Sequence, residues 1–457
     1  MSKRGFALAA SCLCLCGLAV VSLAPGCSFQ PSIYSLETGM PRANGTSEAD
    51  HAGVAIDADT AARADAAAGG TRGAKLPVRP DAVSSVLLAA AGDVMFDRGV
   101  RTVVAEAGAG WPLSAVADIF SGADLGFVNL ETALSDRGQP LPGKGIWFRS
   151  DPRFAQELRD AGISVVSLAN NHSLDYGREA FCDTLAALSA VGVAACGGGR
   201  NIQEARRPAI VRKNGLVISF LAYSELAPIF WSYTDPETFI AEADRPGIPD
   251  WREDQILSDI RRAKSMSHHV IASFHWGDEY SLVPAERQVA LARAAVDAGA
   301  SVVLGHHPHV LQPVEVYRNG VIFYSLGNLV FDQRRAHTTD SLIALLSLTP
   351  YRVEVVQLIP VRIERCRPVP LKGWEARAAM ARFAAMCSAL GTDVVFAGGR
   401  GHVLLTPAPS APGAPGAAGG PSPGMTSILP WMESRITYGG NRISLFPALP
   451  LSACGRF

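Results

Sequence analysis

"SVVLGHHPHVLQPVEVYRNGVIFYSLGNLVFD", residues 301–332, combines a strand-like run, a histidine cluster and a hairpin signal. The apolar start predicts a short buried strand, because such runs are typical of strands covered on both faces. Asn319 and Gly320 stand between two β-rich runs, a pairing typical of tight hairpin turns. A second such signal, Asn214 and Gly215, lies earlier in the chain. The sheets are therefore expected to contain antiparallel pairs.

On both sides of this segment, β-rich runs alternate with helical stretches or follow one another directly. The strand-like runs are 85–93, 125–131, 163–172, 270–275, 341–349 and 353–364, and the helix candidates are 151–162, 177–192, 251–266 and 284–300. Alternation of this kind favours βαβ units, which the two hairpins interrupt. The pattern predicts an α/β fold in which mixed sheets pack together under helices, rather than a uniform parallel barrel.

The ends of the chain differ in composition from its centre. Residues 28–82 and 406–424 are rich in small residues and proline without apolar periodicity, which predicts a flexible tether and a linker. Residues 83–405 carry the ordered pattern and form the expected domain, and the tail 425–457 has no assigned role. The formal net charge of -1 and the lack of a basic run argue against nucleic acid as a partner.

Residues 1–27 have the pattern of an export signal. Lys3 and Arg4 precede an apolar run that ends in small residues and Pro25. Cys27 follows directly and resembles the lipidated cysteine of a bacterial lipoprotein. We therefore expect an exported protein of the cell envelope, anchored to the membrane through Cys27, with soluble export or an uncleaved anchor as the alternatives.

Side chains that can bind metal or substrate stand at the carboxyl ends of five expected strands. They are Asp93, Asn129 and Glu131, Asn170 to His172, His275, and His306, His307 and His309. Singly, each has a plainer explanation as a helix cap, a turn residue or a core histidine. Because strand ends line up along one edge of an α/β sheet, the five together predict one crevice.

Carboxylate, amide and imidazole groups form a mixed set of ligands. This set suits one or two divalent ions such as Mn, Fe or Zn, rather than Ca or a structural zinc bound by thiolates. Such ions lower the pKa of a bound water. His172 or His275 could then protonate a leaving oxygen.

Five segments resemble the successive signatures of one family. They are "GDVMFDRGV" (92–100), "FVNLETAL" (127–134), "SLANNHSLDYG" (167–177), "HWGDEY" (275–280) and "GHHPHVLQPVEVYRNGVIFYSLGNLVFD" (305–332). They look like the CapA family of poly-gamma-glutamate capsule synthesis proteins, whose domain is related to the calcineurin-like metallophosphatases. The resemblance runs from about Leu87 to Asp332 and implies a four-layer α/β/β/α metallophosphatase-like sandwich.

The resemblance also implies roles for single residues. The implied metal ligands are Asp93, Glu131, Asn171, His275, His307 and His309, and the implied catalytic acids are His172 and His275. Met95 stands where the phosphatases have a histidine ligand, which puts a second ion in doubt. The expected substrate-binding or supporting residues are Arg149, Asn129, Asp175, His306 and Glu279.

Three functions follow from this resemblance. The first is a role in the synthesis, export or anchoring of an anionic capsule polymer such as poly-gamma-glutamate. The second is a metal-dependent phosphoesterase acting on a phosphate ester of the envelope. The third is a non-catalytic accessory protein that binds the polymer or the capsule synthase subunits, so whether the chain is an enzyme stays open.

Overall fold

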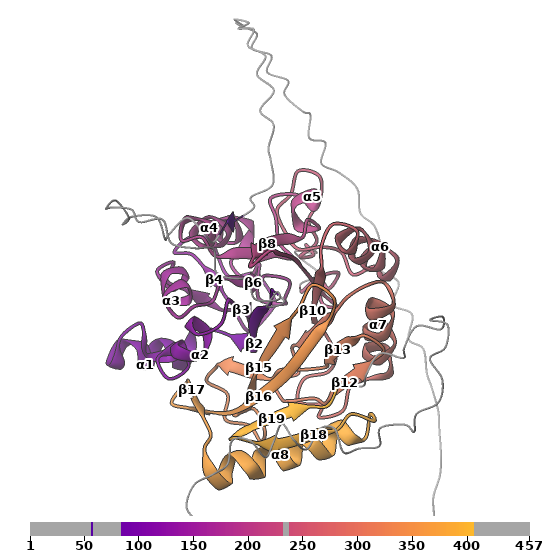
Figure 1. The fold of residues 1–457 in the computed structure, drawn as a ribbon. Coiled ribbons are helices and arrows are strands. Elements are labelled where there is room, and N and C mark those ends of the chain that lie inside the picture. The colour runs from indigo at the N-terminus through magenta and orange to yellow at the C-terminus, as the bar shows by residue number, and fades with distance from the viewer. Residues whose placement is uncertain (1–55, 58–83, 232–236, 406–457) are drawn as a thin grey trace, which may run out of the picture. The chain divides into compact units, whose positions relative to one another are not determined.

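The computed structural model describes residues 56–57, 84–231 and 237–405 (Figure 1). The expected leader, linker and C-terminal tail lie outside the described residues, as does the expected tether apart from residues 56–57. Among the helices of the described part, none is both long and apolar enough to cross a membrane. The structure therefore describes mainly the expected domain of residues 83–405.

Seven strands form the first sheet, in the order β1-β8-β9-β10-β11-β13-β12. They are β1 (Ile56–Asp57), β8 (Ala209–Lys213), β9 (Leu216–Ser224), β10 (His269–His275), β11 (Val302–His306), β12 (Val314–Tyr317) and β13 (Gly320–Phe323). The four strands from β9 to β13 in this order run parallel, whereas β8 with β9 and β12 with β13 are antiparallel hairpins. Asn214 and Gly215 both have positive φ, as the tight turn before β9 requires.

Ten strands form the second sheet, in the order β18-β19-β16-β15-β2-β3-β6-β7, with β14 beside β2 and β17 beside β16. They are β2 (Val86–Val94), β3 (Leu125–Leu130), β6 (Val165–Ser167), β7 (Ala194–Cys196), β14 (Asn328–Val330), β15 (Asp340–Leu348), β16 (Val353–Glu364), β17 (Arg367–Pro370), β18 (Val394–Ala397) and β19 (Arg400–Val403). β2, β3, β6 and β7 run parallel, and β15 and β16 continue the sheet as antiparallel strands. A separate small pair joins β4 (Ala133–Leu134) to β5 (Arg149–Ser150).

Helices cover the outer faces of the two sheets (Figure 1). α6 (Glu253–Lys264) and α7 (Glu286–Asp297) pack on the first sheet. α2 (Ala117–Ser121) and α4 (Gly177–Ala190) pack on the second. α8 (Gly373–Ser388) packs against β16, β18 and β19 and also contacts β12 of the first sheet, where Cys387 Sγ accepts the Val314 N–H at 3.4 Å. The remaining helices are α1 (Arg98–Ala107), η2 (Trp111–Leu113), α3 (Phe154–Asp160) and α5 (Ile202–Ala205). The four helix candidates read from the sequence correspond to α3, α4, α6 and α7.

The two sheets pack against each other through a shared apolar core. In β11, Val302 and Leu304 belong to this central core, whereas Val303 between them packs with α6 and α7. This alternation is what a strand covered on both faces requires. Phe127 of β3 stacks on Phe220 of β9, with ring centroids 5.7 Å apart, and ties one sheet to the other. The mixed α/β sandwich predicted from the sequence is confirmed.

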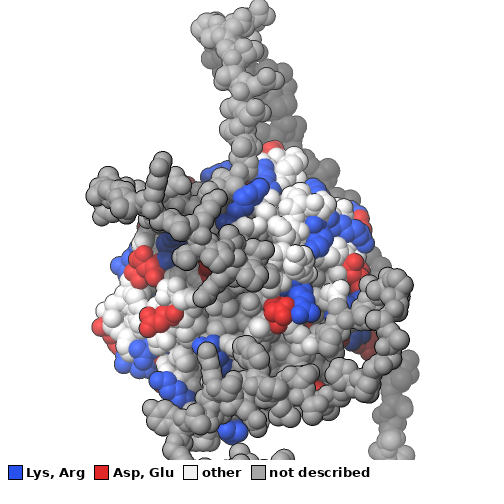
Figure 2. All heavy atoms as spheres, in the orientation of Figure 1, with Lys and Arg blue, Asp and Glu red and all other residues white. Residues whose placement is uncertain are grey.

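The exposed face shown in Figure 2 carries charges of both signs. Lys and Arg side chains lie among Asp and Glu side chains rather than in one patch. This mixture agrees with the formal net charge of -1.

Candidate functional site

The carboxyl ends of strands from both sheets meet at one place. In the second sheet, Asp93 of β2 is in register with Asn129 of β3 and with Asn328 of β14. In the first sheet, His275 of β10 is in register with His306 of β11. Parallel pairing thus carries the residues that end each strand to the same edge, as the sequence predicts. The histidine and carboxylate segments are brought together although they are far apart along the chain.

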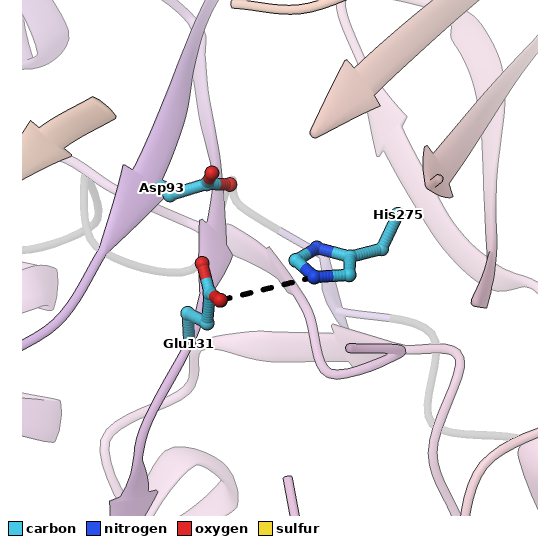
Figure 3. Close-up of side chains that lie close together, drawn as sticks. All are labelled: Asp93, Glu131 and His275. Atoms are coloured by element: carbon cyan, nitrogen blue, oxygen red, sulfur yellow. Dashed lines mark ion pairs between the residues drawn. The ribbon is translucent and has the colours of Figure 1, made fainter. Parts of the chain in front are cut away.

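Asp93, Glu131 and His275 form the centre of this cluster (Figure 3). One ligand atom from each lies within 4.8 Å of the others, and all three side chains are buried. His275 Nε2 is 3.8 Å from Glu131 Oε1. Ligands that share one divalent ion stand about 2 Å from it, so donor atoms this close fit a single ion.

The amide of Asn129 links the two sheets beneath this centre. Its Nδ2 donates to Asp93 Oδ1 at 2.9 Å and lies 3.3 Å from His275 Nδ1. Asn170 Nδ2 in turn donates to Asn129 Oδ1 at 3.2 Å. Asn129 is fully buried, so it orients Asp93 and His275 from inside the protein. A substrate-binding role for Asn129 stays a prediction.

The carboxylate of Glu131 has an unusual environment. It is fully buried, yet neither oxygen has a hydrogen-bond partner among the described residues. Burial, and next the charge of Asp93, raise the pKa of Glu131 well above its ordinary value. A buried carboxylate is costly unless it is paired or coordinates a cation. The residues present therefore fit a bound cation at this position.

The histidine cluster closes the site from the first sheet. His306 Nδ1 lies 3.2 Å from Asp93 Oδ1, His309 Nδ1 lies 3.3 Å from Asp93 Oδ2, and the His307 backbone N–H donates to Asp93 Oδ2 at 3.3 Å. Burial alone would raise the pKa of Asp93, but the bonds from His306 and His309 outweigh it and hold this pKa well below its ordinary value. The imidazoles of His306 and His309 and the backbone N–H of His307 thus surround one carboxylate.

The backbone of the cluster is held in a strained form. His307 has φ 95° and His309 has φ 57°, in the region that favours glycine. Such strain persists where the surroundings over-determine the conformation, often at functional sites. The preceding Gly305 lies so close to the carbonyl of Tyr324 that any Cβ would collide with it. Packing therefore requires a glycine before the histidine segment. Gly92, before Asp93, is required for the same reason, because a Cβ there would collide with the carbonyl of Gly327.

The charges of His307 and His309 differ because their surroundings differ. Burial, and next the neighbouring charge of His309, lower the pKa of His307 to about 3. Burial also opposes a charge on His309, but Glu131 and Asp93 outweigh it and raise its pKa to about 9. His307 Nδ1 has no hydrogen-bond partner among the described residues. A neutral imidazole with a free nitrogen is the form that binds a metal.

His172 and its supporting residues form the opposite wall. His172 Nε2 is 3.9 Å from Glu131 Oε1, and Nδ1 is 2.6 Å from Asp175 Oδ2. Asp175 also accepts the backbone N–H of Phe148 at 2.7 Å and is paired with Lys144. Asp175 thus fixes the His172 ring with Nε2 towards the cluster. Burial, and next the Lys144 charge, lower the pKa of His172 well below its ordinary value.

Asn171 reaches the centre through its side chain. Its Oδ1 accepts a hydrogen bond from His275 Nε2 at 2.8 Å, which places this amide oxygen beside Glu131. Its backbone carbonyl accepts from Lys144. The amide oxygen and the imidazole nitrogen are therefore neighbours, as a shared ion requires.

Arg149 and Met95 lie away from the centre of the cluster. The guanidinium of Arg149 stands 4.1 Å from the Tyr176 ring and donates to the carbonyl groups of Arg137 and Gly138. Met95 is buried in the core, where its sulfur accepts the Asp97 N–H. The position at which the phosphatases have a histidine is thus part of the packing here.

Glu279 and His306 complete the expected set. Glu279 is exposed on the loop after β10, and its charge contributes to the raised pKa of Glu131 after burial and Asp93. His306 is fully buried, with its ring centroid 6.1 Å from that of Phe127 and its Nδ1 3.2 Å from Asp93 Oδ1. The substrate contacts expected of Arg149, Glu279 and His306 stay predictions.

Two residues beside the site were not predicted from the sequence, because no motif around them indicates a functional role. Lys144 stands alone in the irregular segment "PGKGIW" yet contacts Asn171, His172 and Asp175. Arg98 begins α1 and lies 4.6 Å above the ring of Phe148. A lone lysine between glycines could have been noticed, but nothing local points to its partners.

The fold and the cluster together define a class: a mixed α/β sandwich with buried carboxylates and histidines where strands of both sheets end. Residues 87–333, just over half of the chain, match the family model described as "Bacterial capsule synthesis protein PGA_cap". The PGA biosynthesis protein CapA of Bacillus subtilis is 33% identical over 283 residues, which cover 62% of this chain and 72% of that protein. The chain therefore belongs to this family of bacterial capsule synthesis proteins.

Two further relatives agree with this assignment. The capsule biosynthesis protein CapA of Bacillus anthracis is 31% identical over 306 residues, or 65% of this chain and 72% of that protein. A probable polyglutamine synthesis accessory protein of Mycobacterium tuberculosis is 31% identical over 278 residues, or 56% of this chain and 71% of that protein. The resemblance noted in the sequence is confirmed at the level of the family.

Proposed function

We propose that this chain binds a divalent metal ion and serves in the synthesis, export or anchoring of an anionic capsule polymer such as poly-gamma-glutamate. The observation that carries the metal is the buried, unpartnered carboxylate of Glu131 beside Asp93 and His275. The polymer is supported by the names of the relatives, which include PGA biosynthesis and capsule biosynthesis proteins.

Asp93, Glu131, Asn171 and His275 would hold the ion, with His307 as a further neutral ligand. This donor set of carboxylate, amide and imidazole suits Mn, Fe or Zn. A bound ion would supply Lewis-acid polarisation and a bound water of lowered pKa. The chain's own part is to orient Asp93 through Asn129 and to exclude bulk water by burying the cluster.

A phosphoesterase acting on an envelope phosphate ester is the second candidate, and the His172–Asp175 pair favours it. Asp175 holds Nδ1 of His172, so Nε2 is directed to the place where an ion and a substrate would meet. An imidazole oriented in this way is suited to protonate a leaving oxygen. Simple polymer binding would not need it.

The location of the protein is part of the proposal. The leader of residues 1–27 supports export to the cell envelope, and Cys27 supports a lipid anchor. Residues 56–57, within the expected tether of residues 28–82, pair with β8 as β1, so only the part before β1 would give the domain reach from the membrane to a capsule synthase.

Complementation of a gene deletion tests the proposal. The deletion strain receives the full chain, an Asp93→Asn variant, a His172→Ala variant or a His402→Ala control, in which the changed histidine lies on β19. We expect the unchanged chain and the control to restore cell-surface polymer and Asp93→Asn to fail. In parallel, His172→Ala should lower phosphoester turnover by about 100-fold or more if the site is catalytic.

Each result has a distinct meaning. Full restoration by Asp93→Asn would contradict a role for the metal. Full restoration by His172→Ala, together with no turnover that depends on His172, would contradict the phosphoesterase and leave an accessory role. Normal capsule in the deletion strain would contradict the role in polymer synthesis, export or anchoring.

A further inference from the structure

Two arginines near the site each contact an aromatic ring, and each ring lies beside a histidine of the site. Arg98 lies 4.6 Å from the ring of Phe148, which stacks on His172 with centroids 3.8 Å apart. Arg335 lies 4.2 Å from the ring of Tyr280, whose centroid is 6.3 Å from that of His309. The same arrangement therefore occurs twice, once beside each wall of the cluster.

The segment that carries Arg335 is tied to the site by hydrogen bonds. Gln333 Oε1 accepts from Asn328 Nδ2 at 3.0 Å, and Asn328 is the partner of His309. Gln333 Nε2 also donates to the Tyr280 hydroxyl at 3.4 Å, and the Tyr280 N–H donates to the Pro308 carbonyl at 2.8 Å. On the other side of Arg335, the Thr338 carbonyl accepts from Asn328 Nδ2 at 3.1 Å, so the chain is tied near the histidine cluster both before and after Arg335.

The segment is also joined to the start of α1. Asp332 pairs with Arg98 and accepts the backbone N–H of Gly99 at 3.0 Å. The two arginines therefore stand on connected pieces of backbone.

The charges of these arginines are available for an anionic ligand. Arg335 is exposed and pairs with no acidic side chain among the described residues. The side chain of Arg98 is 37% exposed and has one acidic partner, Asp332. A guanidinium over an aromatic ring can still donate from its N–H edges, which match a carboxylate in a bidentate way. On Arg98, one of these N–H groups already donates to Asp332.

We propose that Arg98 and Arg335 bind successive carboxylates of an anionic polymer and so place the chain across the metal cluster. This inference rests on the proposed function and names the residues that would select its substrate. Arg149 differs in that its guanidinium donates to the carbonyl groups of Arg137 and Gly138, and its expected substrate contact stays a separate prediction. Two separate cationic positions favour a ligand with repeated charges, because the second contact is made within one complex.

Binding of poly-gamma-glutamate to the full chain tests the inference. The variants are Arg335→Gln and Arg98→Gln, and the matched control is Arg352→Gln. Arg352 is also exposed, but it follows β15 at the end where Leu348 pairs with Val86, far from Asp93. The dissociation constant is measured at several salt concentrations, together with the metal content and with binding of free glutamate.

We expect Arg335→Gln and Arg98→Gln each to weaken polymer binding by about threefold or more, as loss of a charged contact at a surface does. Each should also flatten the salt dependence of binding, since fewer charges are then screened. The control should bind like the unchanged chain, and free glutamate should bind far more weakly than the polymer.

Arg335→Gln decides the outcome, because Arg335 has no acidic partner in the part of the chain that the structure describes and its loss should leave the fold intact. Polymer binding by this variant equal to that of the unchanged chain would overturn the inference, as would equal losses in the control. Metal content separates this result from the proposed function. If the Arg335→Gln variant retains metal and binds polymer like the unchanged chain, the proposed metal site is unaffected and only the role of the arginines is contradicted.

Discussion

Replacing Glu131 with glutamine is expected to weaken metal binding by the full chain by more than about 100-fold, because even changes to residues that only orient a ligand cost about 10- to 100-fold. Glutamine keeps the size of the side chain and removes the charge that the cluster leaves unpaired. The metal-free variant should be at least as stable as the metal-free original, since a costly buried carboxylate is gone. Metal content and chelator-treated thermal unfolding measure both effects.

Glu354→Gln is the matched control for this prediction. Glu354 lies on β16 and pairs with exposed Arg352, so its loss should change neither the metal content nor the stability by much. A Glu131→Gln chain that retains as much metal as the original would contradict the ligand role. A metal-free variant that is strongly destabilised would show that Glu131 has a structural partner instead.

Replacing Lys144 with methionine is expected to destabilise the chain by about 3–5 kcal/mol, the usual cost of leaving a buried charge without its partner. Only 2% of the Lys144 side chain and none of the Asp175 side chain is exposed. Burial raises the pKa of Asp175 to about 7 despite the opposing charge of Lys144, so this carboxylate depends on its partner. Denaturant unfolding of the full chain measures the loss.

A double variant identifies the cause of this loss. Lys144→Met with Asp175→Asn removes both charges and should recover part of the stability, because no unpaired ion remains. Arg352→Met breaks an exposed ion pair and serves as the control. A Lys144→Met chain as stable as this control would contradict the buried pair. A double variant less stable than Lys144→Met would indicate a role for Asp175 beyond the pair.

The elements that the sequence predicts well are those whose signals are local. β11 (Val302–His306) and the turn at Asn214 and Gly215 depend on apolar runs and on residues that accept positive φ. The turn before β13 is displaced by one residue, with Arg318 at positive φ and Gly320 already in the strand. Turn chemistry thus indicates a hairpin more reliably than its register.

The elements that the sequence does not predict depend on distant contacts. α8 (Gly373–Ser388) is rich in alanine, and its faces differ little in hydrophobicity. The sequence therefore has no apolar stripe that would predict this helix. Met380 and Phe383 nevertheless enter the central core, which stabilises the helix through packing. The short strand β19 likewise forms against β16, and β18 forms against β19.

The same distinction applies to the site. Asp93, Glu131 and the histidines could be predicted because strand ends collect at one edge of a sheet. Which of these side chains turn to a ligand depends on packing and hydrogen bonds. Asn129, for example, donates to Asp93 and lies beside His275 instead of joining the ligands. Lys144 and Arg335 come from irregular segments, whose positions follow from hydrogen bonds to other parts of the chain.

The metal content of the full chain tests the central claim most directly. The chain is purified, stripped with a chelator, and dialysed against Mn²⁺, Fe²⁺ or Zn²⁺ beside an Asp93→Asn variant, and bound metal is then measured by mass spectrometry. We expect the unchanged chain to retain at least one divalent ion per molecule and the variant to retain far less. Retention of no divalent ion by the unchanged, folded chain, even at high metal concentration, would contradict the account.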